Sequence, residues 1–269
     1  MIRVLAYNSV TAELPVEVKH FPGGEVHVTV KRAVPLADHL EIHAHLPNAV
    51  EVMVLLNVVD AVRRLYSGVP VDLVMPYVPY ARQDRVANVG EALSAKVFCS
   101  LINAQGFRSV RIQDPHSDVV SALLDNVCID SPLLSLRRAL SQTGDAALVA
   151  PDAGARKRVM MLGTELNRPV VFADKSRDTV TGKISGTRLA SELLDMPLLI
   201  VDDICDGGWT FTELAKALKA EQAARGFNQP IYLYVTHGIF SKGLDPLLPY
   251  FENIFTRNNW TSDTRCTLV

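Results

Sequence analysis

Residues 198–210 constrain the fold more than any other part of this chain. Four apolar residues at 198–201 form the short uninterrupted run that predicts a buried strand. Two adjacent carboxylates, Asp202 and Asp203, follow at its carboxyl end. A glycine-containing turn comes next, and a helix is predicted to begin near Thr210. The segment therefore predicts a strand, an acidic pair, a tight turn and a helix in immediate succession.

The turn at residues 206–208 is suited to binding a phosphate. Its backbone N–H groups can point at an anion, and the N-terminus of the following helix lies behind them. Carboxylates repel an anion bound beside them. The acidic pair therefore indicates a ligand with an anionic group for the turn and hydrogen-bond donors for the carboxylates. A sugar phosphate is such a ligand, because Asp202 and Asp203 can accept hydrogen bonds from ribose hydroxyls. The alternative is a strand whose end carries helix-capping aspartates.

The composition indicates an ample core and excludes a general attraction to polyanions. Hydrophobic residues make up 48% of the 269 positions and the formal net charge is −2, so we expect neither nucleic acid nor a membrane as a partner. The four cysteines show no CxxC pair and no metal-ligand spacing. No signal peptide and no apolar run approaching roughly 20 residues is found. We therefore expect a cytoplasmic protein.

Strand-like and helix-like stretches alternate along the chain, which favours an α/β fold with mainly parallel sheets. The predicted strands are residues 2–7, 26–30, 41–45, 71–76, 109–113, 147–150, 170–173, 198–202 and 231–235. The predicted helices are residues 48–66, 91–104 and 210–225, each closely followed by a glycine. The strand–loop–helix order starts again near Ala146, so we expect two similar domains at residues 1–140 and 141–269. The boundary is expected near residues 131–143, where a short helical stretch is followed by Gly144 and Asp145.

Polar residues gather where several predicted strands end. Ligands of open α/β sheets bind at the carboxyl ends of the strands. The polar segments there are residues 77–84, 113–118, 151–154, 174–178 and 236–238. Together they predict an edge lined by arginine, lysine, histidine and aspartate.

Ordered motifs in these segments resemble the ribose-phosphate pyrophosphokinase (PRPP synthetase) family. Residues 76–84 are similar to its Pro-Tyr-x-x-Tyr-Ala-Arg-Gln-Asp segment, 94–96 to Ser/Thr-Ala-Lys and 113–116 to the Asp-Leu-His motif. Residues 151–154 match Pro-Asp-x-Gly, 174–177 match Asp-Lys-x-Arg, 236–238 match Thr-His-Gly, and 201–210 resemble the ribose-phosphate loop. The resemblance runs from about residue 21 to residue 258. It implies two phosphoribosyltransferase-like domains with the active site mainly between them, the first contributing to the ATP site.

The resemblance implies transfer of the β,γ-pyrophosphoryl group of ATP to the 1-hydroxyl of ribose 5-phosphate, with Mg²⁺, in nucleotide biosynthesis. Lys175 and Arg177 match the catalytic pair that opens the flexible loop. Arg82 and Gln83 match ATP contacts. His116 and Asp152 match positions that support Mg²⁺ and the triphosphate, with Asp152 the better direct ligand because Mg²⁺ prefers oxygen.

Each of these positions also has a structural interpretation. Arg82 can pair with Asp84 on the surface, His116 can cap a turn, and Asp152 can cap a helix. The segment after Arg177, with its Thr-Gly turn, is either a mobile lid or a plain hairpin, or both.

The resemblance also implies a ribose 5-phosphate site and an oligomer. Six residues are assigned to the ribose-phosphate loop: Asp202, Asp203, Asp206, Gly207, Gly208 and Thr210. Residues 21–25, which include Phe21 and Glu25, resemble a segment that reaches the adenine of ATP bound to a neighbouring subunit. A homodimer or higher homo-oligomer is therefore expected, although Pro-Gly-Gly forms a turn before a strand in any case.

Three substitutions depart from the family pattern. Trp209 stands where a glycine or small residue is usual, Gly207 replaces a threonine, and Gly23 replaces an aspartate. The chain is also shorter than typical members, and we do not expect allosteric control by phosphate or ADP. The indole must point away from the phosphate or line a wider pocket, and we favour simple packing against its own helix.

These departures leave other functions open. The acceptor is either ribose 5-phosphate or a ribose 5-phosphate ester such as ADP-ribose, for which Trp209 could stack on a ring. A phosphoribosyltransferase shares the acidic loop but lacks the segment at residues 82–84 and the tandem domains. A non-catalytic family member is disfavoured by the retained Lys175, Arg177 and Asp152.

Overall fold

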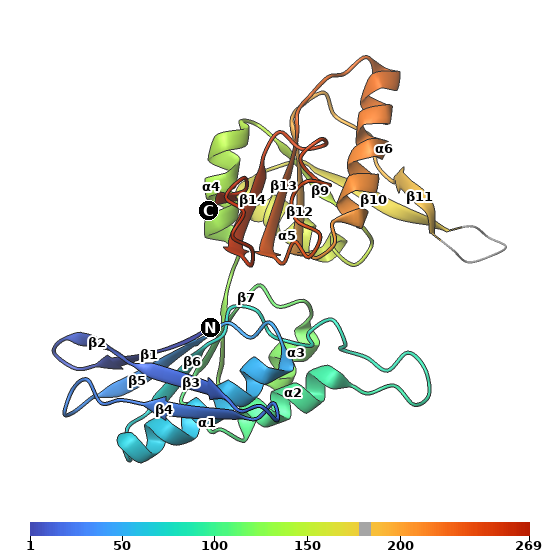
Figure 1. Ribbon diagram of the computed structural model, residues 1–269. Coiled ribbons are helices and arrows are strands. Elements are labelled where there is room, and N and C mark those ends of the chain that lie inside the picture. Colours follow the sequence, from blue (N-terminus) through green and yellow to red (C-terminus); the bar gives the residue numbers. More distant parts are fainter. Residues whose placement is uncertain (178–183) are drawn as a thin grey trace. The chain divides into compact units, whose positions relative to one another are not determined.

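The computed structural model describes residues 1–177 and 184–269, and the side chains at 175–177 and 184–187 are outside this description. The chain divides into two compact units, Met1–Ser131 and Pro132–Val269 (Figure 1). This division falls before helix α4 (Leu133–Thr143), whereas the sequence suggested residue 140. The reason is that α4 buries Leu136 and Ala139 in a core of the second unit.

The first unit is built on a six-stranded sheet in the order β2-β1-β5-β6-β7-β8. The strand β1 is antiparallel to both β2 and β5, and the remaining neighbours are parallel. The strands are β1 (Ile2–Tyr7), β2 (Thr11–Leu14), β5 (His39–Ala44), β6 (Val71–Val74), β7 (Val110–Gln113) and β8 (Val127–Asp130). The carboxyl ends of β6 and β7 therefore lie at the same edge.

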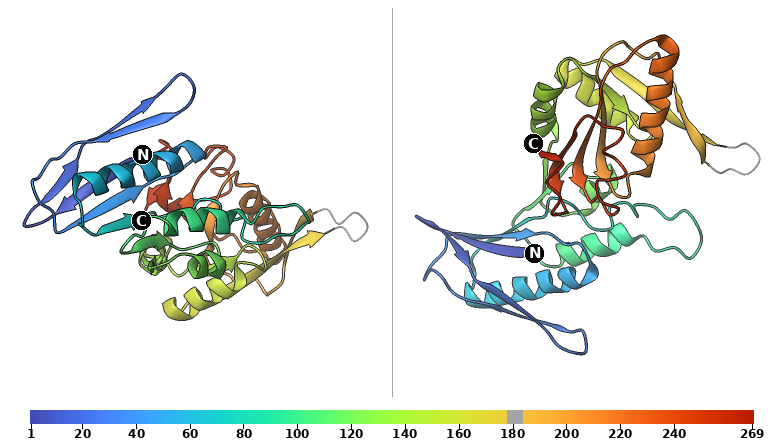
Figure 2. Two further views of the ribbon diagram at one scale, coloured as in Figure 1. Left: turned by 90° about the horizontal axis from the view of Figure 1, so that it is seen from below. Right: turned by 45° about the horizontal axis from the view of Figure 1, so that its top comes forward.

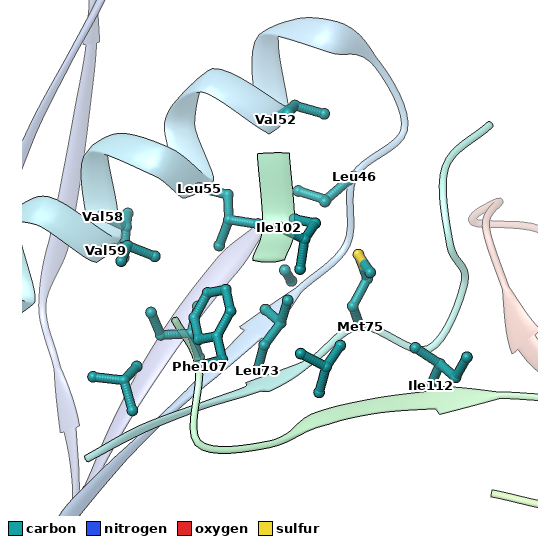
Figure 3. Close-up of a cluster of buried hydrophobic side chains, with 14 of the residues drawn as sticks. Leu46, Val52, Leu55, Val58, Val59, Leu73, Met75, Ile102, Phe107 and Ile112 are labelled. Carbon is teal, nitrogen blue, oxygen red and sulfur yellow. The ribbon is translucent and has the colours of Figure 1, made fainter. Parts of the chain in front are cut away.

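The core of the first unit lies between this sheet and two helices (Figure 3). Helix α1 (Ala49–Leu65) carries an apolar stripe that includes Leu55, Val58 and Val62. It begins at Asn48, whose side chain accepts a hydrogen bond from the Glu51 N–H at 3.1 Å. The other helices are α2 (Ser94–Asn103) and the short α3 (Asp118–Leu123).

A two-stranded hairpin, β3 (Val16–His20) and β4 (Val26–Val30), packs beside α1. Its valines add to the edge of the first core. The loop at its tip is closed by hydrogen bonds from the Phe21 N–H to the Glu25 carbonyl and from the Gly24 N–H to the Phe21 carbonyl. The expected turn at residues 21–25 is therefore present.

The second unit is built on a seven-stranded sheet in the order β11-β10-β9-β12-β13-β14-β15. All neighbours are parallel except β10 and β11, which form an antiparallel pair. The strands are β9 (Ala147–Ala150), β10 (Val170–Arg177), β11 (Ile184–Leu189), β12 (Leu198–Cys205), β13 (Ile231–Gly238), β14 (Ile254–Asn259) and β15 (Thr267–Leu268).

Helices cover both faces of the second sheet (Figure 2). Helix α6 (Trp209–Arg225) packs Leu214 and Leu218 on one face. Helices α4 and α5 (Arg156–Leu166) pack on the other. Successive residues of β12 alternate between these two cores, which explains why this strand is uniformly apolar up to Val201.

The prediction of an α/β fold with mainly parallel sheets is confirmed, and every predicted strand and helix is present. The ends of β1, β4 and β9 are as predicted, and those of the other predicted elements are shifted. The sequence missed β2, β3, β8, β11, β14, β15, α3 and α5. In the described part of the chain, no helix is both long and apolar enough to cross a membrane.

Candidate functional site

The acidic pair lies inside β12 rather than after it. The strand was predicted to end at residue 202, but it pairs with β13 as far as Cys205 and Gly238. Because side chains alternate along a strand, the two aspartates differ in exposure. The Asp203 side chain is 6% exposed and the Asp202 side chain 20% exposed. The two carboxylates are therefore not equivalent.

Arg158 lies against this acidic pair and was missed by the sequence analysis. Its Nη1 atom is 3.0 Å from Oδ1 of Asp203 and 3.9 Å from Oδ1 of Asp202. Arg158 belongs to the first turn of α5, which follows the Pro-Asp-x-Gly motif at the end of β9. Because β9 and β12 are neighbouring parallel strands, the helix that follows β9 starts beside the end of β12.

Burial raises the pKa of the Asp202 carboxyl well above its ordinary value, and repulsion from Asp203 adds to this. The positive charge of Arg158 opposes the rise without cancelling it. The pair therefore retains a proton over a pH range in which an isolated aspartate is ionised.

The turn after β12 leads directly into α6. The helix begins at Trp209, one residue before the predicted start, with Gly208 as its N-cap. Gly208 has φ +81°, and a Cβ atom there would lie 3.0 Å from Cδ2 of Leu247, so glycine is required. The N–H groups of Phe211 and Thr212 donate to the Gly208 carbonyl at 3.0 and 3.1 Å.

A second segment, residues 239–242, lies along this turn. The N–H groups of Ile239 and Phe240 donate to the Cys205 carbonyl at 2.9 and 3.0 Å, and the Ser241 N–H donates to the Asp206 carbonyl at 3.1 Å. These bonds bring Lys242 beside Gly207, where its Cγ atom lies 3.7 Å from the position of a Cβ. Lys242 is exposed, and the sequence analysis did not single it out.

Trp209 is 72% exposed, and its ring lies near a lysine two turns further along α6. The Lys216 ammonium lies 5.8 Å from the centroid of its ring, and the same ammonium lies 5.6 Å from the Tyr250 ring. This arrangement favours the interpretation that the indole packs along α6.

Asp152 caps the turn that leads into α5. Its Oδ1 atom accepts hydrogen bonds from the N–H groups of Gly154 at 3.0 Å and Ala155 at 3.2 Å. A half-buried carboxylate oriented in this way is a ligand that fits Mg²⁺. Among the described residues, no three His, Cys, Asp or Glu side chains form a metal cage. A single carboxylate of this kind would suit Mg²⁺, an ion that binds proteins through one or two carboxylates and keeps several waters.

The start of the expected flexible loop is anchored by Arg156. Its Nη2 atom lies 2.7 Å from Oδ2 of Asp174, and its guanidinium lies 5.4 Å from the centroid of the Phe172 ring. The backbones of Lys175 and Arg177 belong to β10, whereas their side chains and residues 178–183 lie outside the described residues. The arms of this segment are the antiparallel strands β10 and β11.

The first unit brings the Arg-Gln-Asp segment next to the segment that contains His116. Arg82, Gln83 and His116 are exposed, whereas Asp84 is buried and pairs with Arg85 at 3.1 Å. Burial alone would raise the pKa of the Asp84 carboxyl, but hydrogen bonding and the charges of Arg85 and His116 lower it below its ordinary value. Asp84 thus has a structural role, whereas the neighbouring Arg82 and Gln83 are exposed at the surface.

Two further observations concern the predicted ATP residues. The Gln83 carbonyl accepts a hydrogen bond from the Ala95 N–H at 3.2 Å, which ties the loop to the first turn of α2. Phe21 is 52% exposed at the hairpin tip, and Glu25 is exposed beside it. Each predicted ATP residue of the first unit therefore presents its side chain at the surface.

Comparisons with known proteins point to one family. The family model described as the N-terminal domain of ribose phosphate pyrophosphokinase matches residues 4–106. The ribose-phosphate pyrophosphokinase of Clostridium perfringens (strain 13 / Type A) is 30% identical over 246 residues, which cover 88% of this chain and 73% of that protein. This chain belongs to the ribose-phosphate pyrophosphokinase family.

Other relatives support the assignment. The ribose-phosphate pyrophosphokinase of Thermotoga maritima is 30% identical over 258 residues, covering 92% of this chain and 78% of that protein. The crystal structure of phosphoribosylpyrophosphate synthetase from Mycobacterium smegmatis matches with a TM-score of 0.78 at 20% identity, covering 96% of this chain and 86% of that one. The structural match confirms the fold. Neither an ADP-ribose acceptor, a phosphoribosyltransferase nor a non-catalytic subunit is favoured by these relatives.

Proposed function

We propose that this chain transfers the β,γ-pyrophosphoryl group of ATP to the 1-hydroxyl of ribose 5-phosphate, which yields PRPP and AMP. The observation that carries the proposal is the acidic pair in β12, followed at once by the glycine turn and the start of α6. Membership of the ribose-phosphate pyrophosphokinase family supports the same reaction.

In this proposal the second unit holds the sugar phosphate. The ribose 2- and 3-hydroxyls bind at the end of β12 that carries the acidic pair, where a carboxylate can accept their hydrogen bonds. The 5-phosphate lies on the turn of Asp206, Gly207 and Gly208, near Thr210, where the first N–H groups of α6 are directed. Lys242, whose Cγ atom lies 3.7 Å from the position of a Cβ on Gly207, adds a positive charge near the place of the missing threonine hydroxyl.

The first unit, residues 1–131, contributes to ATP binding through side chains that the fold leaves exposed. Arg82 and Gln83 contact the phosphates, and His116 supports the triphosphate or a metal-bound water. Phe21 and Glu25 contact the adenine of ATP in a neighbouring copy of the chain. This last contact requires a homodimer or higher homo-oligomer.

Asp152 is the carboxylate that we assign to Mg²⁺. When bound, Mg²⁺ neutralises charge on the triphosphate and fixes its geometry. The 1-hydroxyl oxygen forms a bond to the β-phosphorus, and its proton passes to solvent water. The bond from that phosphorus to the oxygen of the α-phosphate breaks, and AMP leaves. Lys175 and Arg177 stabilise the charge that spreads over the transferred group.

We also propose a cytoplasmic location, because ATP and ribose 5-phosphate are metabolites of that compartment. The four cysteines, which are all free thiols in the structure, are consistent with a reducing environment.

The test is a product assay with ATP, Mg²⁺ and ribose 5-phosphate, read by chromatography. The proposal predicts AMP and PRPP in equal amounts without any added nucleobase. ADP-ribose in place of ribose 5-phosphate serves as the competing acceptor. Formation of ADP, a requirement for a base, or AMP release only with ADP-ribose would each contradict the proposal.

A further inference from the structure

Two arginines of helix α5 reach the ends of two different strands. The sheet order β10-β9-β12 places β9 in the middle, and α5 starts directly after β9. Arg156 reaches to one side and pairs with Asp174 of β10 at 2.7 Å. Arg158 reaches to the other side and pairs with Asp203 of β12 at 3.0 Å. The first turn of α5 thus fixes the carboxylates of both neighbouring strands.

The pairing of Arg158 is unequal between the two aspartates of β12. Its Nη1 atom lies within hydrogen-bond distance of Asp203 but 3.9 Å from Asp202. The Asp203 side chain is 6% exposed and that of Arg158 18% exposed, so this contact is shielded from water. Asp202, at 20% exposed, is the more accessible carboxylate of the two.

A buried carboxylate needs a partner, because removing its charge from water is costly. A guanidinium is suited to this role, since it stays charged and donates several hydrogen bonds in a fixed plane. The ion pair with Arg158 therefore holds the Asp203 carboxylate in one orientation. The strand then presents the second carboxylate, Asp202, outward with a defined geometry.

We infer that Arg158 is a positioning residue. It holds Asp203 in an ion pair within the protein, and Asp202 accepts the hydrogen bonds of the ribose diol. The inference rests on the proposed function, because it assigns roles within the proposed ribose 5-phosphate site. Arg158 acts through Asp203 and does not touch the reacting atoms.

The test compares variants in steady-state kinetics and in direct titration with ribose 5-phosphate. Arg158→Met is expected to raise the KM for ribose 5-phosphate roughly 10- to 100-fold, the range for residues that orient a binding group. Arg158→Lys keeps the charge but loses the planar fork, so an intermediate KM is expected. The KM for ATP is expected to change less than about twofold in both variants.

The matched control is Arg168→Met. Arg168 pairs with Asp145 and lies after the end of α5, so this change also removes an arginine–aspartate pair. Its KM for ribose 5-phosphate is expected to match that of the parent protein. If Arg158→Met does not fold, the KM of the Arg158→Lys variant for ribose 5-phosphate is compared with that of the parent protein instead.

A double-mutant cycle distinguishes positioning from independent contacts. Because Arg158 acts through Asp203, adding Asp203→Asn to Arg158→Met is expected to change the KM by less than about twofold. Multiplicative effects of the two changes would overturn the inference, as would an unchanged KM in Arg158→Met. It would also be overturned if the KM values for both substrates rose together with a lower thermal midpoint.

Measurements of ribose 5-phosphate binding and AMP release by the parent protein distinguish the proposed function from the inference about Arg158. A parent protein that binds ribose 5-phosphate but does not release AMP contradicts the proposed function, and the cycle is then read from the dissociation constants. A parent protein that does not bind ribose 5-phosphate overturns both. An active parent with an unaffected Arg158→Met variant overturns this inference alone.

Discussion

The aromatic ring of Phe240 occupies the space in which a side chain on Gly238 would begin. Phe240 itself has φ +47° and is 2% exposed, so its ring is held in place by the surrounding core. This local geometry turns the chain so that Ser241 and Lys242 run beside Asp206 and Gly207. The glycine of the Thr-His-Gly motif therefore has a steric function next to the turn at residues 206–208.

Gly238→Ala is expected to lower the free energy of unfolding by about 2 kcal/mol, because the new methyl group must displace a buried ring. The matched control is Gly23→Ala, where no atom lies within 4 Å of the new Cβ, and the expected change is within about 0.5 kcal/mol. Urea denaturation measures both. Equal stability of the two variants would show that the ring moves aside at no cost.

Asp202→Asn is expected to stabilise the protein and weaken ribose 5-phosphate binding. Because the folded-state pKa of Asp202 is raised, its ionisation costs stability as the pH rises through that pKa. The variant is expected to be about 1–2 kcal/mol more stable than the parent at pH 7, since a like charge is removed. This gain is expected to vanish below pH ~4, where Asp202 is protonated in both states.

Two measurements check this prediction: chemical denaturation of parent and variant at several pH values, and ribose 5-phosphate titration. The same measurements are made on Asp206→Asn, which also removes a carboxylate from this segment but lies outside the ion pairs with Arg158. A variant that is less stable at neutral pH but binds the sugar normally would contradict the assignment of Asp202.

The effect of Asp72→Asn on the free energy of unfolding is expected to have the opposite dependence on pH. Asp72 is buried and accepts hydrogen bonds from Arg108 Nε and from the Ser109 hydroxyl, both at 2.9 Å. Burial alone would raise the pKa of the Asp72 carboxyl, but these bonds and the Arg108 charge lower it. Its stabilising effect is therefore present above the ordinary aspartate pKa and is lost as the pH falls through the lowered value.

The Arg108 side chain is 50% exposed, so solvent screens this pair and we expect Asp72→Asn to cost only about 1 kcal/mol at pH 7. The difference from the parent is expected to shrink toward pH 3, as followed by urea denaturation. A difference that stays constant over this range would exclude a contribution from ionised Asp72.

Lys242→Met is expected to raise the KM for ribose 5-phosphate up to about fivefold, because one exposed charge near the 5-phosphate is lost. The effect is expected to decrease as the salt concentration increases. Lys219→Met on α6 removes the same charge farther from the turn and is the control. Equal KM values for the two variants at low salt would assign no phosphate contact to Lys242.

The sequence was sufficient to predict those helices and strands that show a characteristic apolar pattern within their own residues. The apolar run before Asp202 and the helical spacing of α1 predict their elements because burial on one or both faces dictates residue type. Helix α5 escaped prediction because its first turn is basic and its apolar stripe is reduced to Val159 and Leu162. Strand β11 lies in a polar stretch and pairs only at the edge of the sheet.

The motifs identified the acidic pair and the turn but not their supporting contacts. The ion pair between Arg158 and Asp203 depends on the order β9-β12 in the sheet, and sequence spacing carries no such information. The unequal exposure of Asp202 and Asp203 required knowing that β12 continues to Cys205. The roles of Lys175 and Arg177 stay predictions from the motif.

The most direct measurement is a crystal structure of the protein with ribose 5-phosphate bound. We predict that the sugar diol contacts the Asp202 carboxylate, that the 5-phosphate lies on residues 206–210, and that Asp203 remains paired with Arg158. A sugar bound at any other place on the second unit, or a phosphate away from the N-terminus of α6, would contradict the account.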